Sequence, residues 1–176
     1  MIDKQQNIIL IGFMGSGKTT LAKLLAAKLG LVRREVDEEV LAISGYSSIR
    51  ELFHEKGEVF FRQMETKVLE DALKKTHQVI SPGGGAPVRN GELLMKSGTI
   101  IYLKCSLKVI KNRLQEDFSR PLLSKVKSVE DLYLERSVIY EKLADFTIDA
   151  EVRIEEVLEL ALSCVKLQRE NLQEVF

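Results

Sequence analysis

The chain has 176 residues, 45% of them hydrophobic and 30% charged, which is the composition of a globular domain with one core. Lysine plus arginine and aspartate plus glutamate both total 26, so the net charge of zero argues against a broad nucleic-acid or acidic-membrane surface. No apolar run approaches the roughly 20 residues of a membrane span, and the polar opening residues lead us to expect no secretory signal. We expect a single cytoplasmic domain over residues 1–176, a monomer, with Cys105 and Cys164 reduced.

The first third of the chain alternates short apolar runs with amphipathic ones. The β-branched run 8–11 predicts a strand buried on both faces. Leucines at helical spacing then predict a helix that ends before Gly30, a typical C′ glycine. A short strand is expected over 31–36. Ser48 and Glu51 have the spacing of a capping box for a helix through Phe53.

The rest of the chain continues this alternation. A long helix is expected over about 58–75, strands over 77–81, 99–103 and 146–150, and helices over 106–114, 128–143 and 154–173. Ser128 and Asp131 form a second capping-box pattern. The polar, proline-containing stretch 115–127 predicts a mobile loop. Strands that alternate with helices predict an α/β fold, a three-layer αβα sandwich around a mostly or fully parallel five-stranded sheet.

The most specific motif follows the first predicted strand. Residues 12–19 (GFMGSGKT) fit the phosphate-loop pattern G-x-x-x-x-G-K-[ST], between a strand and a helix as that motif requires. Its glycines let backbone N–H groups point at phosphates, the lysine reaches the β- and γ-phosphates, and the threonine hydroxyl coordinates Mg²⁺. We therefore expect a P-loop fold, with a nucleoside triphosphate bound by Gly12, Gly15, Ser16, Gly17, Lys18, Thr19 and Thr20.

The P-loop alone leaves the fate of the phosphate open between a GTPase-type switch, a mechanical ATPase and a small-molecule kinase. The guanine-reading motif N-K-x-D is absent, the chain is short for a motor, and no apolar run ending in Asp-Glu follows. These observations favour a kinase with a compact acceptor site elsewhere in the chain.

Three further features are candidates for the acceptor site. Glu35 and Asp37 alternate at the end of the second predicted strand, where carboxylates can hold a metal shell or accept a proton; the alternative is an acidic helix start. The glycines 83–85 expose backbone to a ligand, or form a flexible turn. Three arginines suit pairing with an anion, or form surface ion pairs: Arg62, Arg120 and Arg136.

Together these motifs resemble the shikimate kinase family. The matching segments are GFMGSGKTT (12–20), the acidic pair ending in Asp37, GEVFFRQMET (57–66), SPGGGAPV (81–88), RPLL (120–123) and ERSVIYEKLAD (135–145). They occur in the family's order, at near-family spacing, over residues 7–149. The P-loop is common to many families, whereas the F-R-x-x-E, G-G-G and R-P-L-L set is far more specific.

The resemblance implies roles for the matching positions, with ATP and shikimate as the substrates. Asp37 would orient or deprotonate the 3-hydroxyl of shikimate, and Lys18 and Arg120 would neutralise charge on the transferring phosphoryl group. Arg62 and Arg136 would clamp the carboxylate. Arg113 would pack on adenine, and Gly83, Gly84 and Gly85 would face the substrate. The region 37–65 would bind shikimate and 115–127 would form the lid.

One position departs from the family pattern. The family has Asp-x-Asp where this chain has Glu35-Val36-Asp37. Glutamate keeps the charge and reaches about one methylene further, so we expect Mg²⁺ to bind near Thr19 and Glu35 with altered geometry. Two alternatives remain open at this stage, which are a kinase for another anionic metabolite such as gluconate and a nucleotide-binding regulator without catalysis.

Overall fold

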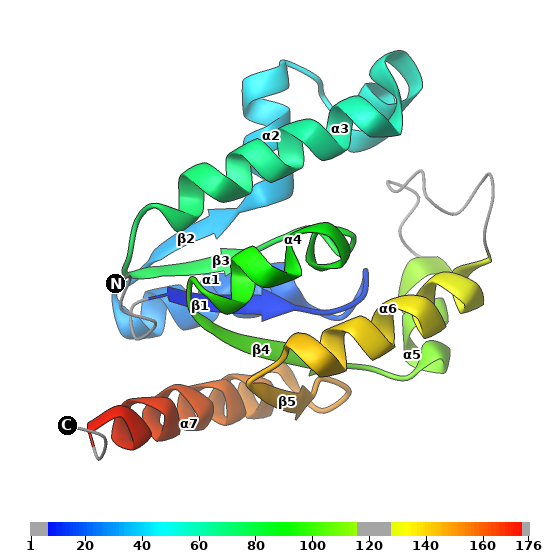
Figure 1. Ribbon diagram of the computed structural model, residues 1–176. Helices are drawn as coiled ribbons and strands as arrows, with labels where there is room; N and C mark the ends of the chain where they lie inside the picture. Colours follow the sequence, from blue (N-terminus) through cyan, green and yellow to red (C-terminus); the bar gives the residue numbers. More distant parts are fainter. Residues whose placement is uncertain (1–6, 116–127, 174–176) are drawn as a thin grey trace.

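The computed structural model describes residues 7–115 and 128–173 (Figure 1). Within these residues, one sheet contains strands β1 (Asn7–Ile11), β2 (Val32–Glu35), β3 (Gln78–Ser81), β4 (Thr99–Lys104) and β5 (Phe146–Asp149). Every pair of neighbouring strands is parallel and the order is β2-β3-β1-β4-β5. The sheet therefore confirms the fully parallel form of the prediction.

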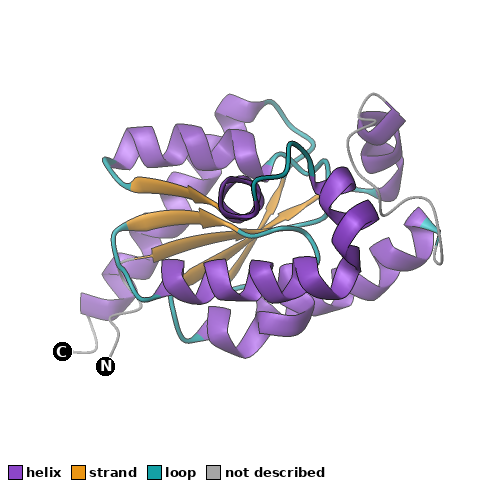
Figure 2. Ribbon diagram, turned by 90° about the horizontal axis from the view of Figure 1, so that it is seen from above, coloured by secondary structure: helices purple, strands orange, loops and turns teal. Residues whose placement is uncertain are grey.

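Helices cover both faces of the sheet, as Figure 2 shows from above. They are α1 (Lys18–Leu29), α2 (Val36–Ser44), α3 (Ile49–Leu73), α4 (Ala86–Met95), α5 (Leu107–Gln115), α6 (Val129–Leu143) and α7 (Ile154–Gln173). The helices α1 and α7 pack together on one face, and α4 and α6 pack together on the other. This confirms the three-layer sandwich. Within the described residues, none of these helices is long and apolar enough to span a membrane.

The core lies where the central strands meet the two helical layers. All five residues of β1 are buried, and Ile9 pairs with Ile80 of β3 on one side and Ile100 of β4 on the other. Such continuous apolar strands fit a parallel sheet that is covered on both faces. Full burial of each such side chain contributes about 1.5–3 kcal/mol, so the sheet centre is a rigid base for the loops at its edge.

Several helix ends agree with the sequence signals. Gly30 ends α1 in a left-handed conformation with φ of 67°, and a complete capping box of Ser128 and Asp131 begins α6. Ser48 caps α3 by accepting a hydrogen bond from the Glu51 N–H. The Glu51 carboxylate bonds to Ser47 rather than Ser48, so the capping box expected there is only half formed.

Two local features differ from the expected pattern, and the state of the cysteines agrees with it. The two helices expected around residue 57 are the two arms of α3, which kinks at Gly57 with φ of 81°. Helix α4 was not expected, because its Pro87 and its glycine, Gly91, look like loop residues; proline is tolerated here in the first turn. Cys105 and Cys164 are free thiols, as predicted.

Candidate active site

The carboxyl ends of the strands form the edge at which the predicted site residues gather. The loop after β1 leads into α1 on one face of the sheet, whereas the loop after the neighbouring strand β3 leads into α4 on the other face. Loops that diverge in this way open a crevice at the strand ends, which is where open α/β sheets bind ligands. In Figure 1, α3 lies on one side of this edge and α6 on the other.

The P-loop occupies the centre of the edge. Gly12, Gly15 and Gly17 have φ values of 155°, 77° and 93°, and residues other than glycine rarely adopt such positive values. A Cβ on Gly12 would lie 2.8 Å from the Leu103 carbonyl oxygen, so the loop also packs closely against β4. Helix α1 begins with no acidic residue in its first turn and no side-chain cap, which leaves its positive end suited to an anion.

Lys18 is buried within this loop. Its Nζ donates hydrogen bonds to the carbonyl oxygens of Gly12 at 2.8 Å and Phe13 at 3.0 Å. The ammonium group is thus held over the loop that the motif assigns to phosphates. Thr19 and Thr20 are exposed in the first turn of α1. The Ser16 hydroxyl is buried and has no hydrogen-bond partner within the described part of the chain.

Arg113 joins α5 to the P-loop. One guanidinium nitrogen donates to the Gly15 carbonyl at 3.0 Å, and the other donates to the Ala150 carbonyl at 3.2 Å. The side chain therefore lies beside the phosphate site and bridges it to the segment after β5. Arg120 and the rest of the predicted lid lie outside the described residues.

A cavity of about 300 Å³ adjoins the P-loop. It brings together the described residues that the sequence assigned to the acceptor: Asp37 from α2, Arg62 from α3, Gly83–Gly85 from the loop after β3, and Arg136 from α6. Apolar walls are added by Met14 of the P-loop and by side chains of α2 and α3. A concave site in which a few polar groups converge among apolar walls is typical of a small-molecule site.

Three polar atoms of this cavity are buried without a hydrogen-bond partner among the described residues. They are Asp37 Oδ1, Glu65 Oε1 and Arg136 Nη1. Each such group costs about 1–3 kcal/mol when it stays unsatisfied. Two acceptors and one cationic donor fit a ligand that carries both hydroxyl groups and a carboxylate.

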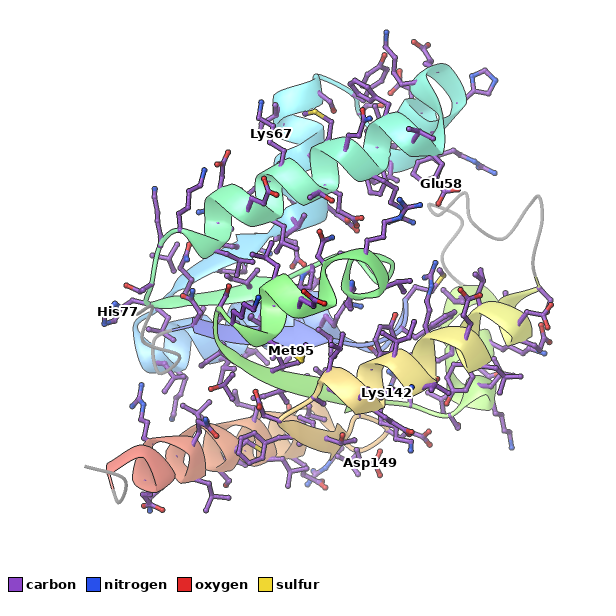
Figure 3. All side chains as sticks on the ribbon, in the orientation of Figure 1. Glu58, Lys67, His77, Met95, Lys142 and Asp149 are labelled. Carbon is purple, nitrogen blue, oxygen red and sulfur yellow. The ribbon has the colours of Figure 1, made fainter. Side chains whose placement is uncertain are left out.

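Arg62 is held in place by carboxylates of its own helix. Its Nη1 donates to Glu65 at 2.8 Å, and its Nε donates to Glu58 at 3.3 Å; Glu58 is labelled on α3 in Figure 3. Burial raises the pKa of the Glu65 carboxyl, and the charge of Arg62 acts in the opposite direction. In the sequence, Glu65 is part of the F-R-x-x-E motif, but no role was predicted for it. The structure shows that it orients Arg62.

Arg136 approaches the cavity from α6. Its guanidinium carbon lies 5.7 Å from the centre of the Phe13 ring, a cation–π contact with the P-loop. Phe13 is itself held edge-on by Tyr133 at 5.6 Å. The two arginines of the cavity therefore come from separate elements, α3 and α6, and each is fixed by its own neighbours.

The glycine-rich loop is closely surrounded by these charged groups. A Cβ on Gly83 would lie 2.7 Å from Asp37 Oδ1 and 2.6 Å from Glu65 Oε1, and a Cβ on Gly85 would lie 2.7 Å from both terminal nitrogens of Arg62. The absence of side chains thus lets two carboxylates and a guanidinium approach the backbone. The alternative of a merely flexible turn does not explain contacts this close.

The acidic pair is arranged differently from the expectation. Strand β2 ends at Glu35, and Asp37 lies in the first turn of α2, so the prediction that both alternate along one strand was wrong and the acidic helix start was right. The helical turn places Asp37 against the glycine-rich loop. Glu35 is buried near the P-loop, 3.3 Å from Arg33.

Burial raises the pKa of the Glu35 carboxyl, against the effects of the Ser81 and Thr19 hydroxyls and the Lys18 charge. The carboxylate, the Thr19 hydroxyl and the Ser81 hydroxyl form an oxygen-rich corner beside the phosphate loop. Oxygen donors of this kind suit Mg²⁺. Within the described residues there is no cluster of three or more His, Cys, Asp or Glu side chains, so a cation here would need phosphate or water oxygens as well.

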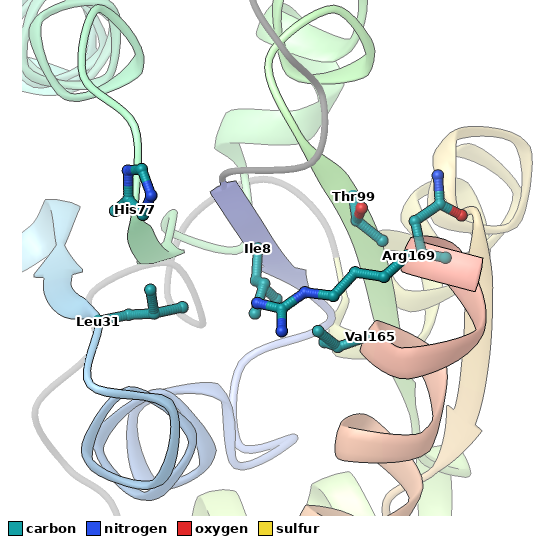
Figure 4. Close-up of a pocket in the computed structure, with 7 residues that line it drawn as sticks. Ile8, Leu31, His77, Thr99, Val165 and Arg169 are labelled. Atoms are coloured by element: carbon teal, nitrogen blue, oxygen red, sulfur yellow. The ribbon is translucent and has the colours of Figure 1, made fainter. Parts of the chain in front are cut away.

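A smaller cavity of about 60 Å³ lies at the opposite end of the strands (Figure 4). Ile8, Leu31, Thr99 and Val165 form its walls, together with His77, Gln168 and Arg169. His77 precedes β3, is exposed and has φ of 62°. This cavity contains none of the residues that the motifs identify, so the active-site candidate is the cavity beside the P-loop.

Comparisons with known proteins identify the family of the chain. A profile of the shikimate kinase family matches residues 14–166. Shikimate kinases of a Sulfurihydrogenibium species and of Thermodesulfovibrio yellowstonii are 37% and 42% identical to the chain, over 87% and 83% of it and 96% and 86% of the relatives. A solved shikimate kinase from Acinetobacter baumannii, in complex with shikimate, has a TM-score of 0.85 and 33% identity, and the match covers 94% of each chain.

A gluconokinase from Sinorhizobium meliloti has a TM-score of 0.59 and 16% identity over 97% of each chain. Identity this low indicates a shared fold only. The profile, by contrast, covers most of the chain, and relatives above 30% identity match over nearly their whole length. The chain therefore belongs to the shikimate kinase family.

Proposed function

We propose that this chain transfers the γ-phosphoryl group of ATP to the 3-hydroxyl of shikimate. The observation that carries the proposal is the cavity beside the P-loop, in which Asp37 Oδ1 and Arg136 Nη1 are buried without partners among the described residues. Shikimate carries hydroxyl groups and a carboxylate on one small ring, which is the pair of functions that these two atoms can satisfy.

The acceptor is held by opposite charges at its two ends. Arg62 and Arg136 bind the carboxylate, because guanidinium groups pair with carboxylates through directed, charge-assisted hydrogen bonds. The backbone of Gly83–Gly85 faces the ring. Asp37 accepts a hydrogen bond from the 3-hydroxyl, and the hydroxyl is then fixed on the side of the cavity nearest the P-loop.

Transfer requires little covalent help from the protein. The phosphoryl group passes through a loose transition state, so positioning and charge neutralisation dominate catalysis. Asp37 takes the proton that the 3-hydroxyl loses as its oxygen bonds to phosphorus and the bond between the γ-phosphorus and the bridging oxygen breaks. Lys18 and the P-loop amides stabilise the negative charge left on ADP. Arg120 supplies further positive charge from the lid.

The nucleotide is held by the P-loop, with Ser16 and Thr20 near its phosphates and Arg113 beside its base. Thr19 and Glu35 would hold Mg²⁺ together with phosphate oxygens, and when bound the ion would neutralise charge on the β- and γ-phosphates. The buried, oxygen-rich corner around Glu35 supports this assignment. The Glu35 carboxylate also contacts Arg33.

The test is ADP release with Mg²⁺-ATP and either shikimate, gluconate or no acceptor at equal concentration. We expect turnover only with shikimate. Turnover only with gluconate would replace the proposed substrate, and ATP binding without acceptor-dependent turnover would favour a regulatory role. The shikimate product is identified by NMR as the 3-phosphate.

A further inference from the structure

Tyr140 connects α6 to the glycine-rich loop and has no role in the mechanism above. Its hydroxyl donates a hydrogen bond to the Gly84 carbonyl oxygen, and the side chain has no exposed surface. The ring is fixed by Tyr102 of β4, with ring centres 5.3 Å apart. The Tyr140 side chain is thus fixed by its ring contact, and its hydroxyl binds the middle glycine of the loop.

Gly84 lies where three elements meet. A Cβ added to it would be 3.5 Å from the Gly12 carbonyl oxygen, 3.5 Å from the Met14 nitrogen and 3.6 Å from the Tyr140 hydroxyl. The loop after β3 is therefore packed between the P-loop and α6. The Tyr140 bond sets how its central peptide unit is rotated within that space.

The flanking carbonyls are already used by the start of α4. The Gly83 carbonyl accepts from the Ala86 N–H at 3.0 Å, and the Gly85 carbonyl accepts from the Val88 N–H at 3.3 Å. The Gly84 carbonyl is bound by a side chain instead. Without the Tyr140 hydroxyl, the peptide unit between Gly84 and Gly85 would lose the hydrogen bond that fixes its orientation.

A peptide unit is planar, and in the trans form its C=O and N–H point in opposite directions. The chain has no cis peptide bond among its described residues. A Gly84 carbonyl that points at Tyr140 therefore turns the Gly85 N–H away from Tyr140. Gly84 and Gly85 both line the acceptor cavity, and Arg62 lies against Gly85.

We infer that Tyr140 is a positioning residue that fixes the Gly84–Gly85 peptide so that the Gly85 N–H meets the acceptor beside Arg62. This inference rests on the proposed function, because it makes the Gly85 N–H a hydrogen-bond donor to shikimate, the proposed acceptor. The Tyr140 hydroxyl is also hydrogen-bonded to Arg136, so the amide signal of Gly85, and not the shikimate kinetics alone, reports the action of Tyr140 on the loop. It follows Arg136 by one helical turn on α6, so the same helix positions the carboxylate clamp and the loop that faces it.

The test is Tyr140→Phe, with Tyr102→Phe as the matched control. Both variants remove one hydroxyl from the same pair of contacting rings, whose planes are tilted by 51°, and only the first removes the bonds to Gly84 and Arg136. Loss of a partner for a buried carbonyl predicts that kcat/KM for shikimate falls by about 5- to 50-fold in Tyr140→Phe. We expect KM for ATP to stay within about twofold in both variants, and Tyr102→Phe to keep the wild-type kcat/KM for shikimate.

A second readout reports the loop itself. The chain has 11 glycines, so a sample labelled with ¹⁵N only at glycine gives a simple amide spectrum. We expect the Gly85 signal to move in Tyr140→Phe without substrate, to lose its response to shikimate, and to stay unchanged in Tyr102→Phe. A Gly85 signal that matches wild type in Tyr140→Phe would overturn the inference even if kcat/KM for shikimate falls, because loss of the bond to Arg136 lowers kcat/KM without the loop.

Equal losses for shikimate and ATP, with a lowered Tm, would also overturn it, because they would indicate a general packing role. Failure of the proposed function has a different signature, namely a wild-type protein that does not phosphorylate shikimate. In that case the positioning of the peptide is decided by the Gly85 signal alone, and an unmoved signal rejects it.

Discussion

The contact between Gly85 and Arg62 allows a substitution that displaces the arginine without changing the arginine itself. Gly85 has φ of −88° and ψ of −18°, which alanine adopts without strain. An added methyl group would nevertheless lie 2.7 Å from both terminal nitrogens of Arg62 and 2.9 Å from the carbon between them. Because the guanidinium is also bound to Glu65 at 2.8 Å, Gly85→Ala must push it out of its site.

The expected effect follows from the bond that is lost. A charge-assisted hydrogen bond to a carboxylate contributes about 1.5–3 kcal/mol, so a displaced Arg62 should raise KM for shikimate by about 10- to 150-fold. The three atoms nearest to this methyl group all belong to Arg62, so KM for ATP should change by less than about twofold. Arg62→Ala should give a similar split between the two substrates.

A double-mutant cycle separates this mechanism from a direct clash with substrate. Steady-state kinetics of Gly85→Ala, Arg62→Ala and the double variant give the coupling between the two positions. If the methyl group acts through the arginine, adding Gly85→Ala to Arg62→Ala costs little more. Additive effects, or equal increases in both KM values, would refute the reasoning.

Three other substitutions test separate parts of the site. Lys18→Ala removes the buried ammonium group from the P-loop and should lower kcat by at least about 100-fold; a normal kcat would reject the phosphate assignment. Asp37→Asn should lower kcat by about 100- to 10,000-fold with a smaller change in KM for shikimate, and an unchanged kcat would remove it from proton transfer. Glu35→Gln replaces a carboxyl whose pKa burial raises above its ordinary 4.5. The folded wild type then binds more protons than the unfolded chain, so its unfolding free energy relative to Glu35→Gln should fall as pH rises from about 4.5 through the raised pKa. Denaturant unfolding of both proteins across this pH range measures the difference. A difference that grows with pH would contradict the prediction.

The parts of the fold that could be predicted from sequence are those that local chemistry dictates. The P-loop, the C′ glycine of α1 and the cap of α6 each depend on a few neighbouring residues, and all three are present. Helix α4 was missed because Pro87 and Gly91 resemble turn residues, although tertiary packing against α3 and α6 holds them in a helix.

The site was predictable as a set of residues but not as a geometry. Asp37 was assigned to a strand edge, and the chain enters α2 one residue before it. The roles of Glu65 and Tyr140 depend on which side chains face one another across the cavity, and no spacing along the sequence contains that information. Arg120 lies outside the described residues, and its part in transfer stays a prediction.

The central claim is that Arg62 and Arg136 bind a carboxylate of the acceptor in the cavity beside the P-loop. Its most direct test is the ratio of kcat/KM for shikimate to that for shikimate methyl ester, in which the negative charge is removed and all hydroxyl groups remain. Loss of charge-assisted bonds predicts a ratio of at least about 10. Equal kcat/KM values for the acid and the ester would contradict the account.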